Sequence, residues 1–68
     1  MTEPVPIAAS SFINSASYDD ATRTLTIEFG GEAKRFKNVP AEIVQALANA
    51  PSPGGFYHRH IKNRYAAA

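Results

Sequence analysis

The sequence predicts an α+β domain: a three-stranded antiparallel β-meander followed by two short α-helices packed on one face of the sheet. Three observations lead to this prediction. Residues 24–29 alternate polar and apolar side chains, as a half-buried strand does. Turn-forming residues flank this segment at 19–23 and 30–32. Two stretches with helical apolar spacing follow at 40–50 and 53–62, each with a proline at its start.

The length of 68 residues allows one domain, near the lower limit for a core without covalent staples. Cysteine is absent, which excludes disulfides and fits a cytoplasmic location. No apolar run approaches the roughly 20 residues that span a bilayer, so no membrane association is expected. We expect residues 1–9 to form a flexible lead-in without signal-peptide character, residues 10–65 to form the single domain, and residues 66–68 to form a frayed tail.

The central strand at 24–29 divides the chain into a buried and an exposed side, because successive strand side chains point to opposite faces. A tight turn at Gly30 and Gly31 leads into a third strand over 33–37. Phe36 of this strand is expected to join the apolar face of the central strand, which consists of Leu25, Ile27 and Phe29.

The first strand is predicted over residues 10–18. Ala16 and Tyr18 share one face of it, whereas Ile13 is out of phase with them. A bulge or bend near Asn14 is therefore needed to turn Ile13 inward as well.

Lys34 interrupts the pattern of the third strand, because it shares the core-facing side with Phe36. Its aliphatic stem can lie on apolar surface while the ammonium reaches water. An inward-pointing lysine on an edge strand also discourages edge-to-edge aggregation. Arg35 and Lys37 fall on the solvent face.

The first helix is expected over residues 40–50, because Pro40 suits a first helical turn and Pro51 and Pro53 end the helix. Its narrow apolar stripe consists of Ile43, Val44 and Leu47, backed by Ala46 and Ala50.

The second helix is expected over residues 53–62, with Ser52 as its N-cap. Gly54 and Gly55 weaken it by about 1 kcal/mol each relative to alanine. Close packing on the first helix or the sheet explains these glycines better than an anion site, because the phosphate-loop spacing is absent. At helical spacing, Phe56, Tyr57, His60 and Ile61 cover one side, and His58, Arg59, Lys62 and Asn63 cover the other.

The predicted core draws on all of these segments, and Tyr65 folds back as a last anchor. Its members are Ile13, Tyr18, Leu25, Ile27, Phe29, Phe36, Val39, Ile43, Val44, Leu47, Phe56, Tyr57 and Ile61.

No catalytic constellation is present in the sequence. His58 and His60 are two residues apart on opposite sides of a helix, so they do not form the i, i+4 pair that ligates one metal. No serine stands in a nucleophile elbow, and Asp19 and Asp20 fit a solvated turn. We therefore expect no catalytic residue, metal, cofactor or small-molecule substrate.

Charge is distributed unevenly along the chain, although the net charge is only +1. Residues 1–33 carry five acidic and one basic residue, and residues 34–68 carry six basic and one acidic residue. Such asymmetry can mark a surface for an anionic partner, or it can arise by chance in a small domain whose charges pair across the fold.

Four segments resemble the KTSC domain in order and spacing: SSFINSASYD at 10–19, TLTIEF at 24–29, RFKNVP at 35–40 and APSPGGFYHRHIKNRY at 50–65. This family is named for its place at the C-terminus of some lysyl-tRNA synthetases, and it also occurs as stand-alone bacterial and phage-type proteins. Its central aromatic-x-aromatic motif falls on residues 34–36, where Phe36 matches and Lys34 does not. The association with a synthetase implies RNA binding.

Two functions remain open for what we expect to be an accessory module without enzyme activity. The first is RNA binding, although the open sheet face lacks an aromatic side chain on which bases could stack. The second is protein–protein interaction by a monomer or weak homodimer, through an exposed sheet edge or an aromatic such as Phe12. The basic residues expected to contact RNA phosphates are Arg35, Lys37, Arg59, Lys62 and Arg64.

Overall fold

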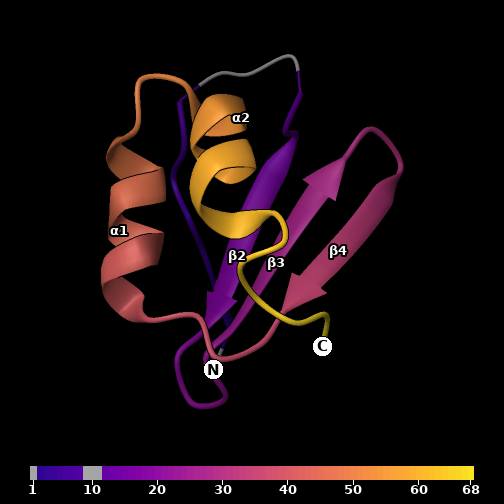
Figure 1. Ribbon diagram of the computed structural model, residues 1–68, viewed down its shortest axis with the longest axis vertical. Helices are drawn as coiled ribbons and strands as arrows, with labels where there is room; N and C mark the ends of the chain where they lie inside the picture. The colour runs from indigo at the N-terminus through magenta and orange to yellow at the C-terminus, as the bar shows by residue number, and fades with distance from the viewer. Residues whose placement is uncertain (1, 9–11) are drawn as a thin grey trace.

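The computed structural model describes residues 2–8 and 12–68, which form an antiparallel sheet with its helices on one face (Figure 1). The α+β class and the antiparallel sheet with two helical segments are confirmed, but the sheet has four strands and not the expected three. The strands lie in the order β1-β2-β3-β4 and comprise Thr2–Pro4, Ser15–Asp19, Thr24–Phe29 and Glu32–Phe36.

Strand β1 lies in the segment expected to be a flexible lead-in. It pairs antiparallel with β2, so that Glu3 lies opposite Tyr18. The next residue after β1, Val5, donates its N–H to the carbonyl oxygen of Ala16 at 2.8 Å, and its side chain is buried. The expectation of a flexible lead-in is therefore wrong for residues 2–5. The backbone groups at the outer edge of β2 bind this segment, and such pairing leaves no signal in the side-chain pattern.

The C-terminal residues run along the outer edge of β4. The N–H of Lys37 donates to the carbonyl oxygen of Ala66 at 3.0 Å, and the N–H of Ala68 donates to that of Arg35 at 2.9 Å. Residues 66–68 are thus paired with β4 near Phe36, and the expectation of a frayed tail is wrong.

Strand β2 is shorter than the predicted strand at 10–18, of which residues 10 and 11 lie outside the described chain. The backbone is irregular from Phe12 to Asn14, as a bend there requires, and Ile13 is buried. The N–H of Asn14 still donates to the carbonyl oxygen of Glu28 on β3 at 2.8 Å. The bend therefore turns Ile13 into the core without detaching the chain from the sheet.

Strands β3 and β4 pair with Leu25 opposite Phe36 and Ile27 opposite Lys34. The turn between them uses Gly30 at φ +54°, a left-handed conformation that glycine adopts without strain. β4 begins and ends one residue earlier than predicted, but the faces are as expected, with Phe36 buried and Arg35 exposed.

Helix α1 spans Ala41–Asn49, with Pro40 as its N-cap residue. Val44 and Leu47 are buried and Ile43 is partly buried. The expected backing from Ala46 is wrong, because Ala46 is exposed and Ala48 packs against the core.

The second helical segment changes type within its length. Helix α2 spans Pro53–Phe56, and the Ser52 side chain caps it by accepting the N–H of Gly55 at 3.4 Å. A π-helical turn, η1, follows over Tyr57–Ile61 and ends with the N–H of Lys62 donating to the carbonyl oxygen of Tyr57 at 2.8 Å.

This wider turn buries Tyr57 and Ile61 and exposes the three residues between them, so the expected place of His60 on the core-facing side is wrong. Gly54 is buried and in close contact with Phe12, which confirms packing as its role, although Phe12 belongs to the segment before β2 and not to α1 or the sheet.

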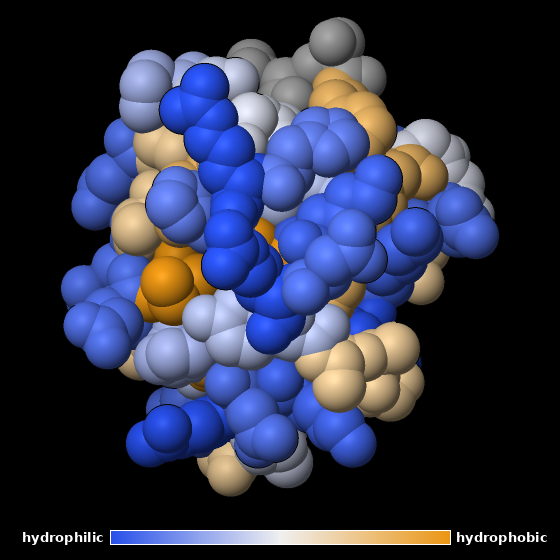
Figure 2. Space-filling model, viewed as in Figure 1, coloured by the Kyte–Doolittle hydropathy of each residue, from blue (hydrophilic) through white to orange (hydrophobic). Residues whose placement is uncertain are grey.

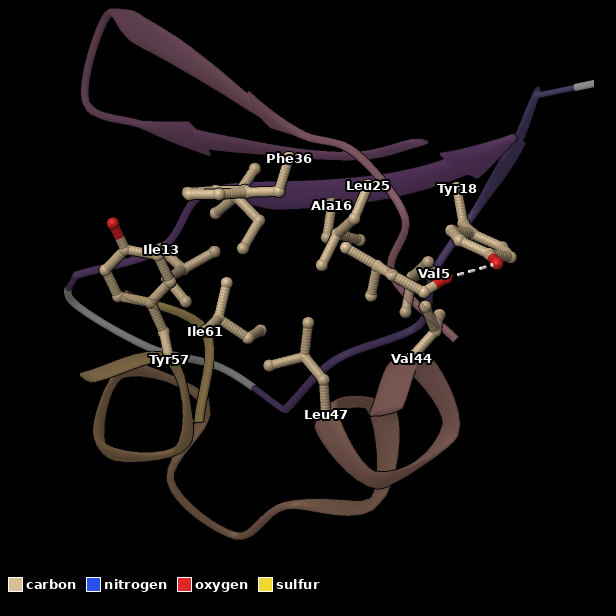
Figure 3. Close-up of a cluster of buried hydrophobic side chains, with 12 residues drawn as sticks. Val5, Ile13, Ala16, Tyr18, Leu25, Phe36, Val44, Leu47, Tyr57 and Ile61 are labelled. Atoms are coloured by element: carbon tan, nitrogen blue, oxygen red, sulfur yellow. Dashed lines mark hydrogen bonds between the residues drawn. The ribbon is translucent and has the colours of Figure 1, made fainter. Parts of the chain in front are cut away.

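The core lies between the sheet and the helices, where side chains from the two layers point toward one another (Figure 3). The Tyr18 hydroxyl donates to the carbonyl oxygen of Val39 at 2.6 Å, the contact drawn as a dashed line. Of the predicted core, Phe29, Ile43 and Phe56 are only partly buried and pack against its rim. Val5, Ala16 and Pro53 are buried although the predicted core did not include them.

Candidate nucleic-acid interface

A hollow of about 630 Å³ lies at the outer edge of β4, beside the residues that follow η1. We call it the β4 hollow. The C-terminal segment, yellow in Figure 1, runs past the C-terminal end of β4. Three cationic side chains, three aromatic rings, one amide and three alanines line it: Lys34, Arg35, Lys62, Phe36, Tyr57, Tyr65, Asn63, Ala33, Ala67 and Ala68.

The cations reach the β4 hollow from two elements. Lys34 lies opposite Ile27 on the helix-covered face of the sheet, and Arg35 lies opposite Thr26 on the open face. Because strand side chains alternate, these two neighbours approach the hollow from both sides of the strand. Lys62 comes from the far end of η1, where the backbone leaves the helix in an extended conformation. Asn63 follows at φ +63° and redirects the chain toward β4.

The charged side chains that line the β4 hollow are all basic. No acidic side chain lines it, and the sequence contains no acidic residue after Glu42. Within the described chain, Lys34, Arg35 and Lys62 are exposed and form no ion pair with a carboxylate. Their charges are therefore available to an anionic ligand.

The structure brings together only part of the predicted set of phosphate-contacting residues. Arg35 and Lys62 meet in the β4 hollow. Arg59 lines a separate hollow of about 210 Å³ between the α1–α2 connection and η1. Lys37 and Arg64 are exposed but line neither of these two hollows.

Sequence reasoning missed Lys34 as a member of the site. Its departure from the strand alternation is visible in the sequence, where a structural role explains it at least as well as a binding role. Two features place Lys34 at the hollow: its register opposite Ile27, and the return of the chain toward β4 after η1.

The opposite edge of the sheet has a different character. A hollow of about 530 Å³ lies between β1, the β2–β3 turn and α1. We call it the β1 hollow. Its charged side chains are both acidic, Glu3 and Asp20, and Gln45 and Asn49 add amides. Across residues 2–8 and 12–68, no cluster of three or more histidine or carboxylate side chains suited to a metal ion is found. No described helix is long and apolar enough to cross a membrane.

The face of the molecule that carries the helices is largely hydrophilic, with only small, separate hydrophobic areas (Figure 2). An extended apolar docking surface is therefore not visible on this face.

Comparison with known proteins assigns the family. Residues 9–65 match the model of the KTSC domain, and the chain belongs to this family. Its fold is also that of a crystal structure of a KTSC domain protein from Yersinia pestis, which superposes with a TM-score of 0.89 at 29% sequence identity and covers 100% of this chain and 96% of that one.

Two kinds of curated relatives are similar to this chain. A lysine–tRNA ligase of Trichormus variabilis is 39% identical over 56 residues, which are 81% of this chain. The chain spans only 10% of the length of that ligase. An uncharacterized protein of Stutzerimonas stutzeri is 37% identical over 57 residues and is matched over 80% of its own length. The same small domain thus occurs within a large enzyme and as most of a small protein.

Proposed function

We propose that this protein is a non-enzymatic module that binds single-stranded RNA, with the cations of the β4 hollow contacting the phosphates. The observation that carries the proposal is the meeting of Lys34, Arg35 and Lys62 around one hollow without an acidic side chain. Phosphate contacts supply most of the sequence-independent affinity of proteins for nucleic acids. The similarity to a small part of lysine–tRNA ligases supports the same class of partner.

The size and composition of the hollow suit such a ligand. A volume of about 630 Å³ is within the range of small-molecule sites, so the hollow accommodates only a short part of a strand. Three cations that each neutralise one phosphate predict a slope of about −2 for log K against log salt concentration on a single strand. Binding is therefore weak and salt-sensitive, which fits an accessory role beside another module.

A fluorescence anisotropy titration with a short labelled single-stranded RNA at low salt tests the proposal. The variants Lys34→Gln, Arg35→Gln and Lys62→Gln each remove one positive charge from the hollow. We expect each of them to lower the affinity and to reduce the salt slope by about 0.7, the contribution of one phosphate contact.

The matched control is Arg23→Gln, which removes one positive charge near Asp20 and Glu42, away from the hollow. This control changes the net charge equally, so it is expected to bind RNA nearly as well as the wild-type protein. Equal losses of RNA affinity in all four variants would mean that net charge alone explains the binding, which would contradict a site at the β4 hollow. An absence of binding at high micromolar protein would overturn the proposal, and salt-independent dimerisation in its place would favour a protein-interaction role.

A further inference from the structure

Phe12 is an exposed aromatic residue whose ring contacts several other aromatic rings. It is 42% exposed, and its ring centroid lies 5.0 Å from that of Phe29 and 6.0 Å from that of Tyr57. Gly54 packs so closely beneath it that a Cβ atom at that position would lie 3.3 Å from the Cβ and Cδ2 atoms of Phe12. The ring therefore packs against these neighbours while part of its surface is open to solvent.

His58 extends this aromatic surface. Its imidazole is stacked with the Phe12 ring, with centroids 5.0 Å apart and an interplanar angle of 23°. The π-helical turn exposes His58 together with Arg59 and His60. Phe12 and His58 thus form a nearly parallel pair of rings, and His58 belongs to a segment of the sequence without acidic residues.

Tyr57 connects this stacked pair with the β4 hollow. Its ring centroid lies 6.0 Å from that of Phe12 and 5.6 Å from that of His58, and Tyr57 also lines the hollow. The stacked pair and the cations therefore lie around one buried ring. A flexible anion with flat groups along its length could contact both places at once.

We propose that the Phe12–His58 pair is a stacking site for an unpaired nucleobase of the RNA whose phosphates contact the β4 hollow; this inference rests on the proposed function. Every nucleobase has a π-face, so stacking on a fixed aromatic surface is tolerant of sequence but requires a base that is not paired. The arrangement predicts that the protein prefers single-stranded over duplex RNA. A nucleic acid fits this surface better than a protein side chain because all charged residues of the segment 58–64 are basic, although Glu32 lies opposite Phe29 on the neighbouring strand.

The test uses a uridine-rich RNA decanucleotide with one central 2-aminopurine, whose fluorescence is quenched when it stacks on an aromatic ring. The protein contains no tryptophan, so the signal reports the RNA alone. We expect the wild-type protein to quench the probe at saturation. Phe12→Leu and His58→Ala are expected to lose most of the quenching and to lower the affinity by about fivefold or more, the usual contribution of one stacked base.

Three comparisons keep the test specific. His60→Ala is the matched control, because His60 is also exposed and also contacts an aromatic ring, that of Phe56 at 4.6 Å. It is expected to keep the quenching, as is Phe12→Tyr, which retains a ring. Phe12→Leu removes no charge, so the salt slope should stay at the wild-type value, unlike that of Lys34→Gln.

RNA binding with undiminished quenching in Phe12→Leu and His58→Ala would overturn the stacking site while leaving the proposed function intact. Equal affinity of the wild-type protein for duplex and single-stranded RNA would overturn it as well. A lack of binding to any RNA would instead overturn both proposals. Because His58 is exposed, His58→Ala reports on stacking even if Phe12→Leu loosens the fold.

Discussion

The two edges of the sheet differ in how they end and in the charge they carry. At one edge, β1 has three residues and contains Pro4, and the β1 hollow beside it is acidic. At the other edge, β4 has five residues, part of its outer backbone is covered by residues 66–68, and the β4 hollow beside it is basic. Short strands, proline and covering segments are the usual means by which proteins protect sheet edges from aggregation.

The contrast shows how an uneven distribution of charge along the sequence leads to sheet edges of opposite charge. The acidic N-terminal half contains β1 and the β2–β3 turn. The basic C-terminal half contains residues 34–36 of β4 and all of η1. The strand order β1-β2-β3-β4 places the first and last strands at opposite edges. The charges of the two halves therefore differ between the two edges, whereas on the open face of the sheet Asp19 and Arg35 line a common hollow. Glu32, at the start of β4, is acidic as well, but it does not line the β4 hollow.

Among the variants that test this contrast, Tyr57→Ala is expected to lower the free energy of unfolding most. Tyr57 is 3% exposed, and its ring centroid lies 5.0 Å from that of Phe29 and 5.9 Å from that of Phe36. Removing a buried aromatic ring typically lowers the free energy of unfolding by about 3–5 kcal/mol. A domain of this size has a total stability of roughly 3–10 kcal/mol, so part of the population should be unfolded at 25 °C. Urea denaturation followed by circular dichroism measures the loss.

Tyr57→Phe is the control for that variant, because it retains the ring and should unfold nearly as the wild-type protein does. A loss below about 1 kcal/mol in Tyr57→Ala would contradict the role of this ring as the support of the β4 edge.

A smaller effect is expected from Tyr18→Phe at the acidic side. Tyr18 lines the β1 hollow, and its hydroxyl donates to the buried carbonyl oxygen of Val39 at 2.6 Å. The substitution leaves that oxygen without its donor, so the free energy of unfolding should fall by about 1–2 kcal/mol. RNA affinity should not change, because the lost contact lies away from the β4 hollow. Reduced RNA affinity in a fully folded Tyr18→Phe protein would show that the two edges are not independent.

Much of the fold could be predicted because its strongest signals are local. Alternation specified β3 and the faces of β4, and proline with serine at a helix start specified the beginning of α2. β1 could not be predicted, since it has no alternating pattern and is held by the backbone of β2. The same reason explains residues 66–68, which pair with β4 through backbone groups alone.

The candidate site was predicted less well than the fold. The sequence identified two of its three basic residues, Arg35 and Lys62, but neither Lys34 nor their grouping, which depends on the register of β4 and on the turn at Asn63. The predicted exposure of residues 53–62 was based on α-helical periodicity, whereas a π-helical turn determines which side chains of Tyr57–Ile61 are exposed. The Phe12–His58 pair joins residues far apart in the sequence, so no local pattern could indicate the stacking.

The most direct test of the account is a chemical-shift map of the ¹⁵N-labelled protein titrated with a short single-stranded RNA. The account predicts shifts at Lys34 and Arg35, at His58, along residues 62–65 and at Phe12. It predicts little change at β1 and at residues 45–49 of α1, which border the acidic β1 hollow. Shifts concentrated at the β1 edge, or spread evenly over both edges, would contradict the claim that RNA binds at the basic edge of the sheet.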